Sequence, residues 1–82
     1  MAYFVYIVKC RDSVLYTGIT WNLKKRILQH NRGIKTFVQQ SRRPVKLVYW
    51  EKFQTRFGAA KRERQIKGLR REKKENLIES LR

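Results

Sequence analysis

Two short apolar stretches on either side of a polar turn restrict the fold of this chain more than any other feature. Residues 3–10 and 14–19 are rich in aromatic and β-branched side chains, and the polar residues Arg11, Asp12 and Ser13 lie between them. Apolar runs of this length around such a short polar connection predict a β-hairpin. The start of the chain is therefore expected to form two antiparallel strands.

The length of the turn fixes which side chains share a face of the hairpin. A three-residue loop pairs Val8 with Tyr16 and Tyr6 with Gly18, so that the two tyrosines lie on one face as diagonal neighbours. A loop one residue shorter would put them on opposite faces. Gly18 leaves no side chain beside Tyr6, and a gap of this kind admits a ligand or another backbone.

The rest of the chain alternates between helical and extended patterns. The first of these elements is a helix over about 23–30, capped by Asn22 and stopped by Asn31 and Gly33. A loop follows over 34–43, with Phe37 and Val38 turned inward, and Pro44 then opens a strand over 45–53. The last two elements are a helix that is capped by Thr55, runs to about 67 and ends at Gly68, and a final helix around Leu69, Leu77, Ile78 and Leu81. The apolar run 47–50 indicates a strand covered on both faces. The pattern has no linker or repeat, so we expect one domain over residues 1–82. Its class is α+β, with a small three-stranded, largely antiparallel sheet flanked by helices in the order ββαβαα.

The charge of the chain restricts its partners. The 82 residues include 21 Lys and Arg against 6 Asp and Glu, a formal net charge of +15. Because this charge is spread along the sequence, a nucleic acid is favoured over an anionic membrane or an acidic protein. The longest apolar run, 3–8, is too short to span a bilayer, and no secretory signal pattern precedes it. With Cys10 as the single cysteine and no internal disulfide, we expect a cytoplasmic protein.

Glu63 is the most informative acidic residue. Helical periodicity places it on the same side as Ala59 and Ile66, toward the protein interior, where a carboxylate needs a partner. That partner is either an Arg or Lys, which gives a structural ion pair, or a divalent cation. The other acids are expected in turns, at strand ends or in solvated helix pairs: Asp12, Glu51, Glu72, Glu75 and Glu79. A single suitable carboxylate implies at most one metal ion, completed by water and phosphate oxygens.

Several side chains near the hairpin have both a structural and a chemical interpretation. Tyr6 and Tyr16 fit ordinary strand aromatics. Arg26 and His30 are four residues apart and share a helix face. Arg26 is either one of many solvated cations or a guanidinium that forks onto phosphate oxygens. His30 is either a histidine at the core edge with one hydrogen bond or a group that handles a proton.

A series of spaced motifs runs through the chain: VYI in the first strand, YTG in the second, Arg26-x-x-x-His30 in the helix, Pro44 before VKLVYWEKF, and AAKRERQIK around Glu63. In this order they resemble the GIY-YIG nuclease superfamily, and most of all its small, stand-alone bacterial members. The resemblance extends from Tyr3 to Ile78, and it implies the same ββαβαα fold.

The resemblance also implies an activity and a set of roles. Family members are metal-dependent endonucleases that nick DNA by attack of water on a phosphate. Glu63 matches the residue that holds one divalent ion, Mg²⁺ or Mn²⁺. Tyr6 and Tyr16 match tyrosines beside the scissile phosphate, and we favour Tyr16 for orienting or activating the water. Arg26 matches the essential arginine, and His30 lies near the site, where it positions Tyr16 or handles a proton.

The chain departs from larger relatives in ways that keep other functions open. Ile19 replaces the lysine that follows YIG in the excision-repair incision subunit, and the KPxYN segment of that protein is absent. These departures favour a catalytically weak module that binds DNA or RNA, or a subunit of a repair complex. No appended DNA-binding domain is present in these residues, so substrate choice comes from this surface or from a protein partner. We favour DNA over RNA as the substrate.

Overall fold

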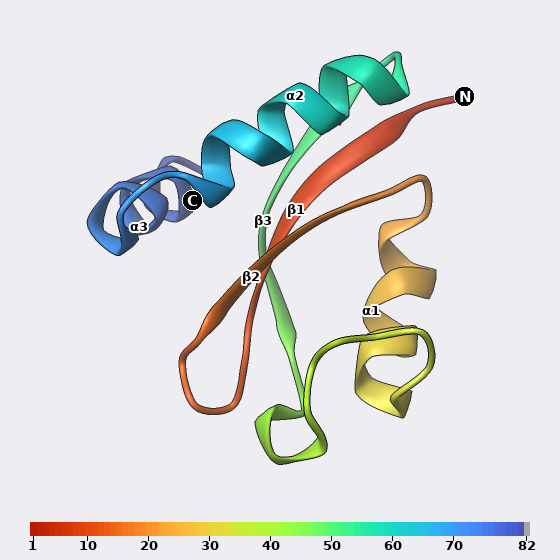
Figure 1. Ribbon diagram of the computed structural model, residues 1–82, viewed down its shortest axis with the longest axis vertical. Coiled ribbons are helices and arrows are strands. Elements are labelled where there is room, and N and C mark those ends of the chain that lie inside the picture. Colours follow the sequence, from red (N-terminus) through yellow and green to blue (C-terminus); the bar gives the residue numbers. More distant parts are fainter. Residues whose placement is uncertain (82) are drawn as a thin grey trace.

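A three-stranded antiparallel sheet lies at the centre of the computed structural model, which describes residues 1–81 (Figure 1). The strands are β1 (Tyr3–Lys9), β2 (Leu15–Thr20) and β3 (Lys46–Phe53), and their order across the sheet is β2-β1-β3. The helices are α1 (Leu23–Arg32), α2 (Arg56–Lys67) and α3 (Arg71–Ser80), and a short 3-10 turn, η1 (Gln40–Arg42), lies between α1 and β3. The predicted α+β class and the order ββαβαα are confirmed.

The hairpin forms in the register that the three-residue turn predicts. Val8 pairs with Tyr16, and Tyr6 pairs with Gly18. The turn is closed by a hydrogen bond of 2.8 Å from the backbone N–H of Cys10 to the carbonyl of Val14. The two tyrosines therefore lie on the same face of the sheet, as expected from a side-chain period of two.

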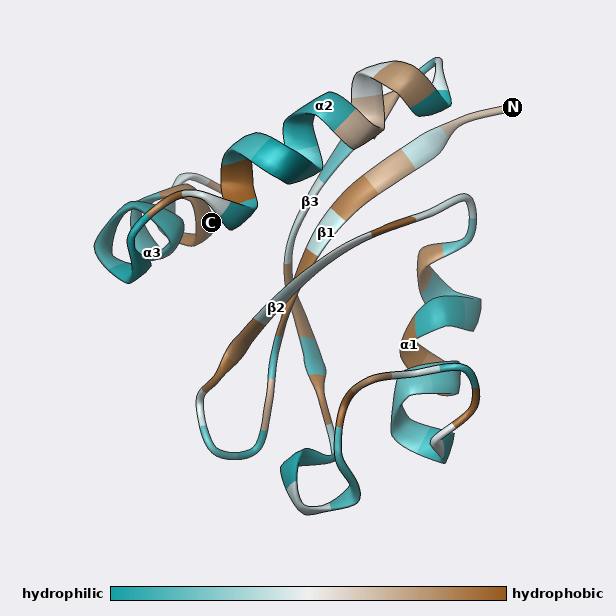
Figure 2. Ribbon diagram, in the orientation of Figure 1, coloured by the Kyte–Doolittle hydropathy of each residue, from teal (hydrophilic) through white to brown (hydrophobic). Residues whose placement is uncertain are grey.

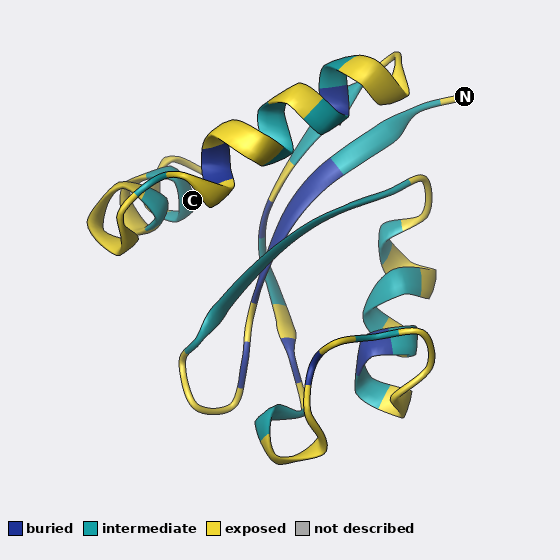
Figure 3. Cartoon of the chain, in the orientation of Figure 1, coloured by how far each residue is buried: buried dark blue, intermediate teal, exposed yellow. Residues whose placement is uncertain are grey.

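Strand β1 is covered on both faces, because α1 and α2 lie on opposite sides of the sheet (Figure 1). Val5 and Ile7 pack with Ala59 and Ile66 of α2. The alternate residues of β1 point the other way, toward α1 and the loop that follows it, in a second cluster formed by Tyr6, Val8, Cys10, Val38 and Val45. The middle of β1 is the apolar, buried centre of the molecule (Figures 2 and 3).

The prediction that β3 is covered on both faces is confirmed only in part. β3 is an edge strand, and of the run 47–50 only Tyr49 is buried. Trp50 remains 41% exposed and packs edge-on against Phe4, with 5.9 Å between ring centroids. Leu47 packs against the cluster on the α1 face, and Val48 and Tyr49 pack in the cluster on the α2 face, so the covering of this strand is partial on both sides.

Helix α1 begins as predicted and ends later than predicted. The Asn22 side chain accepts a hydrogen bond of 3.0 Å from the N–H of Lys25, which caps the first turn. Gly33 ends the helix with a φ of 74°, in the left-handed region. Asn31 was expected to stop the helix but lies within it, and its side chain holds the backbone of Val45 through bonds of 2.6 and 3.3 Å. Asn31 therefore fixes the entry into β3.

The connection between α1 and β3 differs from a plain loop, because η1 interrupts it. Val38 is 2% exposed and fills the cluster on the α1 face. Phe37 was expected to turn inward as well, but it is 94% exposed. One side chain of this pair therefore anchors the connection, and the other stands in solvent.

Helices α2 and α3 are separate elements that meet at a turn. The Thr55 side chain caps α2 by accepting a hydrogen bond of 3.1 Å from the N–H of Gly58, and Gly68 ends the helix, both as predicted. Helix α3 begins after Arg70. Within residues 1–81, none of the helices is both long enough and apolar enough to cross a membrane.

Candidate active site

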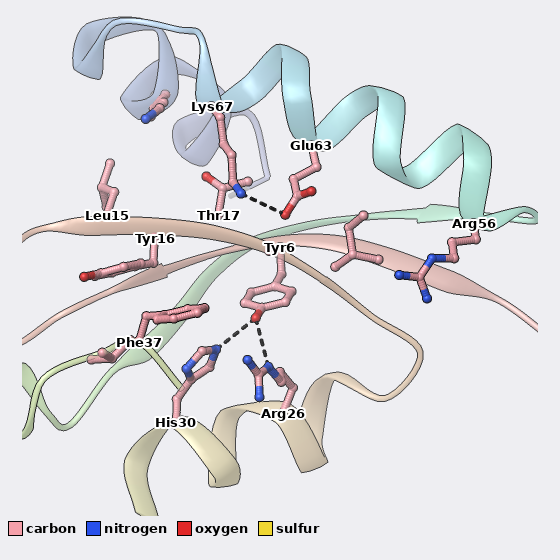
Figure 4. Close-up of a pocket in the computed structure, with 14 residues that line it drawn as sticks. Tyr6, Leu15, Tyr16, Thr17, Arg26, His30, Phe37, Arg56, Glu63 and Lys67 are labelled. Carbon is pink, nitrogen blue, oxygen red and sulfur yellow. Dashed lines mark hydrogen bonds and ion pairs between the residues drawn. The ribbon is translucent and has the colours of Figure 1, made fainter. Parts of the chain in front are cut away.

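A cavity of about 670 Å³ follows the outer edge of β2 and reaches both faces of the sheet (Figure 4). Its walls come from β1, β2, α1, α2, α3 and the connection before η1. Every site residue predicted from the sequence lines it: Tyr6, Tyr16, Gly18, Arg26, His30 and Glu63. The cavity therefore brings together side chains that come from distant parts of the sequence.

Tyr6 lies at the centre of this group. Its side chain is 3% exposed, and its hydroxyl lies 2.8 Å from Nε2 of His30 and 3.3 Å from Nε of Arg26. Figure 4 shows both partners reaching up from α1 toward the phenol. One hydroxyl thus links the arginine and the histidine of the Arg-x-x-x-His pair.

Gly18 makes this position of the phenol possible. A Cβ at Gly18 would lie 2.5 Å from the Tyr6 hydroxyl and 2.7 Å from its Cζ. The sequence predicted an open gap here that would admit a ligand or another backbone. That expectation needs correction, because the ring of Tyr6 itself fills the space.

His30 is buried at 5% exposure and bonded at both ring nitrogens. Its Nδ1 lies 2.6 Å from the hydroxyl oxygen of Thr36, which also accepts a hydrogen bond from the N–H of Val38. Burial, with the nearby charge of Arg26 as the smaller cause, lowers the pKa of His30 to about 4. The imidazole is therefore neutral at neutral pH, so one of its ring nitrogens donates and the other accepts in the contacts with the Tyr6 and Thr36 hydroxyls.

The expectation that His30 positions Tyr16 is wrong, because its partner is Tyr6. The hydroxyl of Tyr16 makes no hydrogen bond to any residue in 1–81, and in Figure 4 it points away from the Tyr6–His30 pair. Tyr16 contributes its ring to the cluster on the α1 face. Both tyrosines share the predicted face, but only one of them enters the hydrogen-bond network.

The ionisation of Tyr6 is controlled by opposing effects. Burial raises the pKa of the phenol most strongly, the hydrogen bond and charge of Arg26 lower it, and the Glu63 carboxylate raises it. The sum of these effects is a raised pKa. Tyr6 is therefore a protonated phenol at neutral pH, and it can hand on a proton only if it receives another one.

Arg26 is held in one orientation by three acceptors. Its Nε donates to Tyr6, and its Nη1 donates to the side chain of Gln29 at 3.2 Å and to the carbonyl of Lys35 at 2.9 Å. Its other terminal nitrogen, Nη2, donates to no residue in the described part of the chain. A guanidinium fixed in this way lines the cavity with donors available to an anion.

Glu63 enters the cavity from α2, across the β2 edge from His30. Its side chain is 23% exposed, and Lys67 lies 3.3 Å from Oε2 one helical turn later. The Lys67 side chain is itself 58% exposed, so this contact is an (i, i+4) pair near the surface and not a buried ion pair. Such a contact leaves the carboxylate available to a cation that enters the cavity.

The donor set around Glu63 suits a particular kind of metal ion. In residues 1–81, no three His, Cys, Asp or Glu side chains gather into a metal-binding group. A site of this kind does not suit zinc, which takes three or four protein ligands. It fits a hard ion such as Mg²⁺, which takes one or two carboxylates and fills its remaining positions with water and phosphate oxygens.

The cavity also has walls that the sequence analysis did not assign to the site: Phe37, Arg56, Lys67 and Lys74. Lys67 was identifiable in principle, since it is four residues after Glu63 on the same helix. Thr36 supports His30 from outside the cavity wall, and it has no distinguishing sequence signal. Arg56 and Lys74 are single members of a large set of cations, so only the fold reveals their position.

The chain is similar to known proteins over most of its length. The chain matches the GIY-YIG catalytic domain over residues 2–76. It is 49% identical to the UPF0213 protein of Staphylococcus saprophyticus over 76 residues, and this alignment covers 93% of each chain. It is 51% identical to the UPF0213 protein of Clostridium perfringens over 77 residues, and this alignment covers 94% of this chain and 83% of the relative.

Two solved structures are similar to the fold. The solution NMR structure of the UPF0213 protein of Bacillus halodurans aligns with a TM-score of 0.62 and 35% identity, over 96% of this chain and 84% of that one. The solution NMR structure of a protein from E. faecalis aligns with a TM-score of 0.67 and 32% identity, over 99% of this chain and 86% of that one.

Proposed function

Because the chain belongs to the GIY-YIG family, we propose that it is a metal-dependent endonuclease that nicks DNA by attack of water on a phosphodiester. The observation that carries this proposal is the contact of Tyr6 with both Arg26 and His30 in a cavity that Glu63 also lines. One such site cleaves one strand at a time. The net charge of +15 supports a polyanionic substrate.

We assign proton transfer to Tyr6 and His30. The attacking water forms a bond to phosphorus, the bond from phosphorus to the leaving oxygen breaks, and the leaving oxygen takes a proton from solvent. The water proton passes to the Tyr6 oxygen while the Tyr6 proton passes to Nε2 of His30, so that no free phenolate accumulates. The bound phosphodiester brings negative charge beside Arg26. This negative charge raises the proton affinity of His30 during the attack of water.

We assign charge stabilisation to Arg26 and ion binding to Glu63. The fixed guanidinium offers Nη2 to a phosphate oxygen and stabilises the charge that develops there. Glu63 would hold one Mg²⁺ or Mn²⁺ ion, and a bound ion of this type supplies Lewis-acid neutralisation of the phosphate. Tyr16 then has a supporting role as a wall of the cavity, in place of the water-activating role that the family resemblance favoured.

A cleavage screen with matched variants tests the proposal. Single-stranded, duplex, flapped and branched DNA, with RNA counterparts, are incubated with magnesium, manganese or EDTA. We expect wild-type protein to cleave at least one DNA with metal, and Glu63→Gln to lose about 10²-fold or more of that rate, because an amide lacks the charge that a hard ion requires. Glu75→Gln is the matched control, since Glu75 is an exposed carboxylate paired with Arg71 outside the cavity.

Thermal unfolding separates loss of chemistry from loss of fold. A surface (i, i+4) pair is worth about 0.5 kcal/mol, so Glu63→Gln is expected to melt close to wild type. Cleavage by Glu63→Gln at the wild-type rate would reject the metal role of Glu63. Tight binding of DNA without cleavage of any substrate would instead identify a nucleic-acid-binding module.

A further inference from the structure

A second hollow of about 400 Å³ continues from the cavity past the first turn of α2. Arg56 and Ile19 line both spaces, and the side chain of Trp21 stands in the wall of the second. We propose that this hollow is a nucleotide subsite, in which Trp21 stacks on an unpaired nucleobase and Arg56 contacts the phosphate between that base and the cleavage site. The inference deepens the proposed nuclease function and rests on it.

Trp21 is exposed but well anchored. It is 60% exposed, an unusual position for the largest apolar side chain. The backbone on either side is fixed, because the Thr20 hydroxyl bonds the N–H of Asn22 at 3.1 Å and Asn22 caps α1. An indole held on a rigid bend loses little conformational freedom when a flat ligand stacks on it.

Arg56 makes the connection between the two spaces. It forms no hydrogen bond or ion pair with any residue that the structure describes, and its side chain is exposed. In Figure 4 it lies beneath the start of α2, on the opposite side of Tyr6 from Tyr16. Phosphates and bases alternate along a nucleic-acid strand. The Arg56 guanidinium has no neutralising partner among residues 1–81 and lies between the proposed phosphate-binding cavity and the Trp21 ring, so it is placed to contact the phosphate next to a stacked base.

The cationic wall of the hollow and its opening into the cavity indicate which ligand occupies it. A neutral or acidic protein could use an exposed tryptophan, but the hollow opens directly into the proposed cleavage cavity and its shared wall is cationic. Every nucleobase offers a flat π-face, so stacking here is expected to tolerate any sequence. The subsite therefore predicts a requirement for a base beside the cleaved phosphate, without a requirement for a particular base.

Intrinsic fluorescence tests the subsite with a single reporter. The chain has two tryptophans, so Trp50→Phe leaves Trp21 as the only one. In EDTA, so that nothing is cleaved, this protein is titrated with a short oligothymidylate and with an abasic oligomer of equal length and charge. We expect the oligothymidylate to quench Trp21 and the abasic oligomer to bind without quenching. Trp21→Phe, which keeps Trp50, is the control and should respond to neither.

Affinity measurements separate the base contact from the phosphate contact. Trp21→Leu should weaken oligothymidylate binding by about 5- to 150-fold, the range for loss of one stacked base, and leave abasic binding unchanged. Arg56→Gln should weaken both oligomers by the same factor. Equal effects of Trp21→Leu on both oligomers, or binding without quenching, would overturn the subsite and leave the proposed function intact. Failure of both oligomers to bind wild-type protein would overturn the subsite, and the cleavage screen with duplex, flapped and branched DNA would then decide the proposed function separately.

Discussion

Acidification tests the neutral state of His30 on which the proton-transfer assignment depends. Its pKa is about 4 in the folded protein, against 6.5 for an unperturbed histidine. Between these two values the unfolded chain binds more protons than the folded protein, so the free energy of unfolding falls as the pH decreases from 6.5 to 4. Above this window both states are neutral at His30. The difference in pKa corresponds to about 3 kcal/mol, a large share of the stability of so small a domain.

The assay compares urea unfolding of wild-type protein and His30→Gln across this pH range. Subtraction of the two curves removes the contribution of the other titratable groups. We expect the stability advantage of wild type over His30→Gln to shrink by about 3 kcal/mol between neutral pH and pH 4. Because the chain has one histidine, the NMR titration of its imidazole gives the folded pKa directly. A midpoint near 6.5, or parallel stability curves for the two proteins, would refute the buried neutral state.

Three further predictions follow from the site. Arg26→Lys keeps the charge but loses the fork that bonds Tyr6, Gln29 and Lys35, so single-turnover cleavage should drop by about 10²-fold or more while DNA binding stays near wild type; equal rates would remove Arg26 from the chemistry. Gly18→Ala places a Cβ 2.5 Å from the Tyr6 hydroxyl and should cost about 1–3 kcal/mol in urea unfolding, but much less in a Tyr6→Ala background, where nothing remains to collide; an undiminished cost there would place the strain elsewhere. DNA affinity should fall by about 10³-fold or more between 50 and 200 mM salt, and a flat response would exclude a largely electrostatic interface.

Local rules were sufficient for the hairpin and the helix ends. The register of Tyr6 and Gly18 follows from the turn length and a side-chain period of two, and both were correct. Asn22, Thr55 and Gly33 act as helix caps because their backbone and side-chain chemistry is local. The family resemblance implied the set of site residues, and all of them line one cavity.

Features that depend on distant parts of the chain were not predictable in the same way. β1 is the central strand because β3 pairs with it on the side opposite β2. The apolar residues of β3 do not indicate which strand it pairs with. The partner of His30 depends on a side-chain choice: both tyrosines share its face, but only the ring of Tyr6 lies over Gly18 and reaches Nε2. Sequence periodicity identifies a face, whereas the rotamer and the neighbouring gap select the contact.

The position of the cavity explains why the site needs an edge strand. Arg26 and His30 approach from the α1 face, and Glu63 approaches from the α2 face. A central strand would separate these groups, because neighbouring strands would cover both of its sides. β2 has a partner on one side only, and the absence of a side chain at Gly18 lets Tyr6 lie against this edge. A phosphate bound at the β2 edge would therefore meet groups from both faces of the sheet. A substitution whose side chain covers this edge should abolish cleavage without changing any of the proposed catalytic side chains.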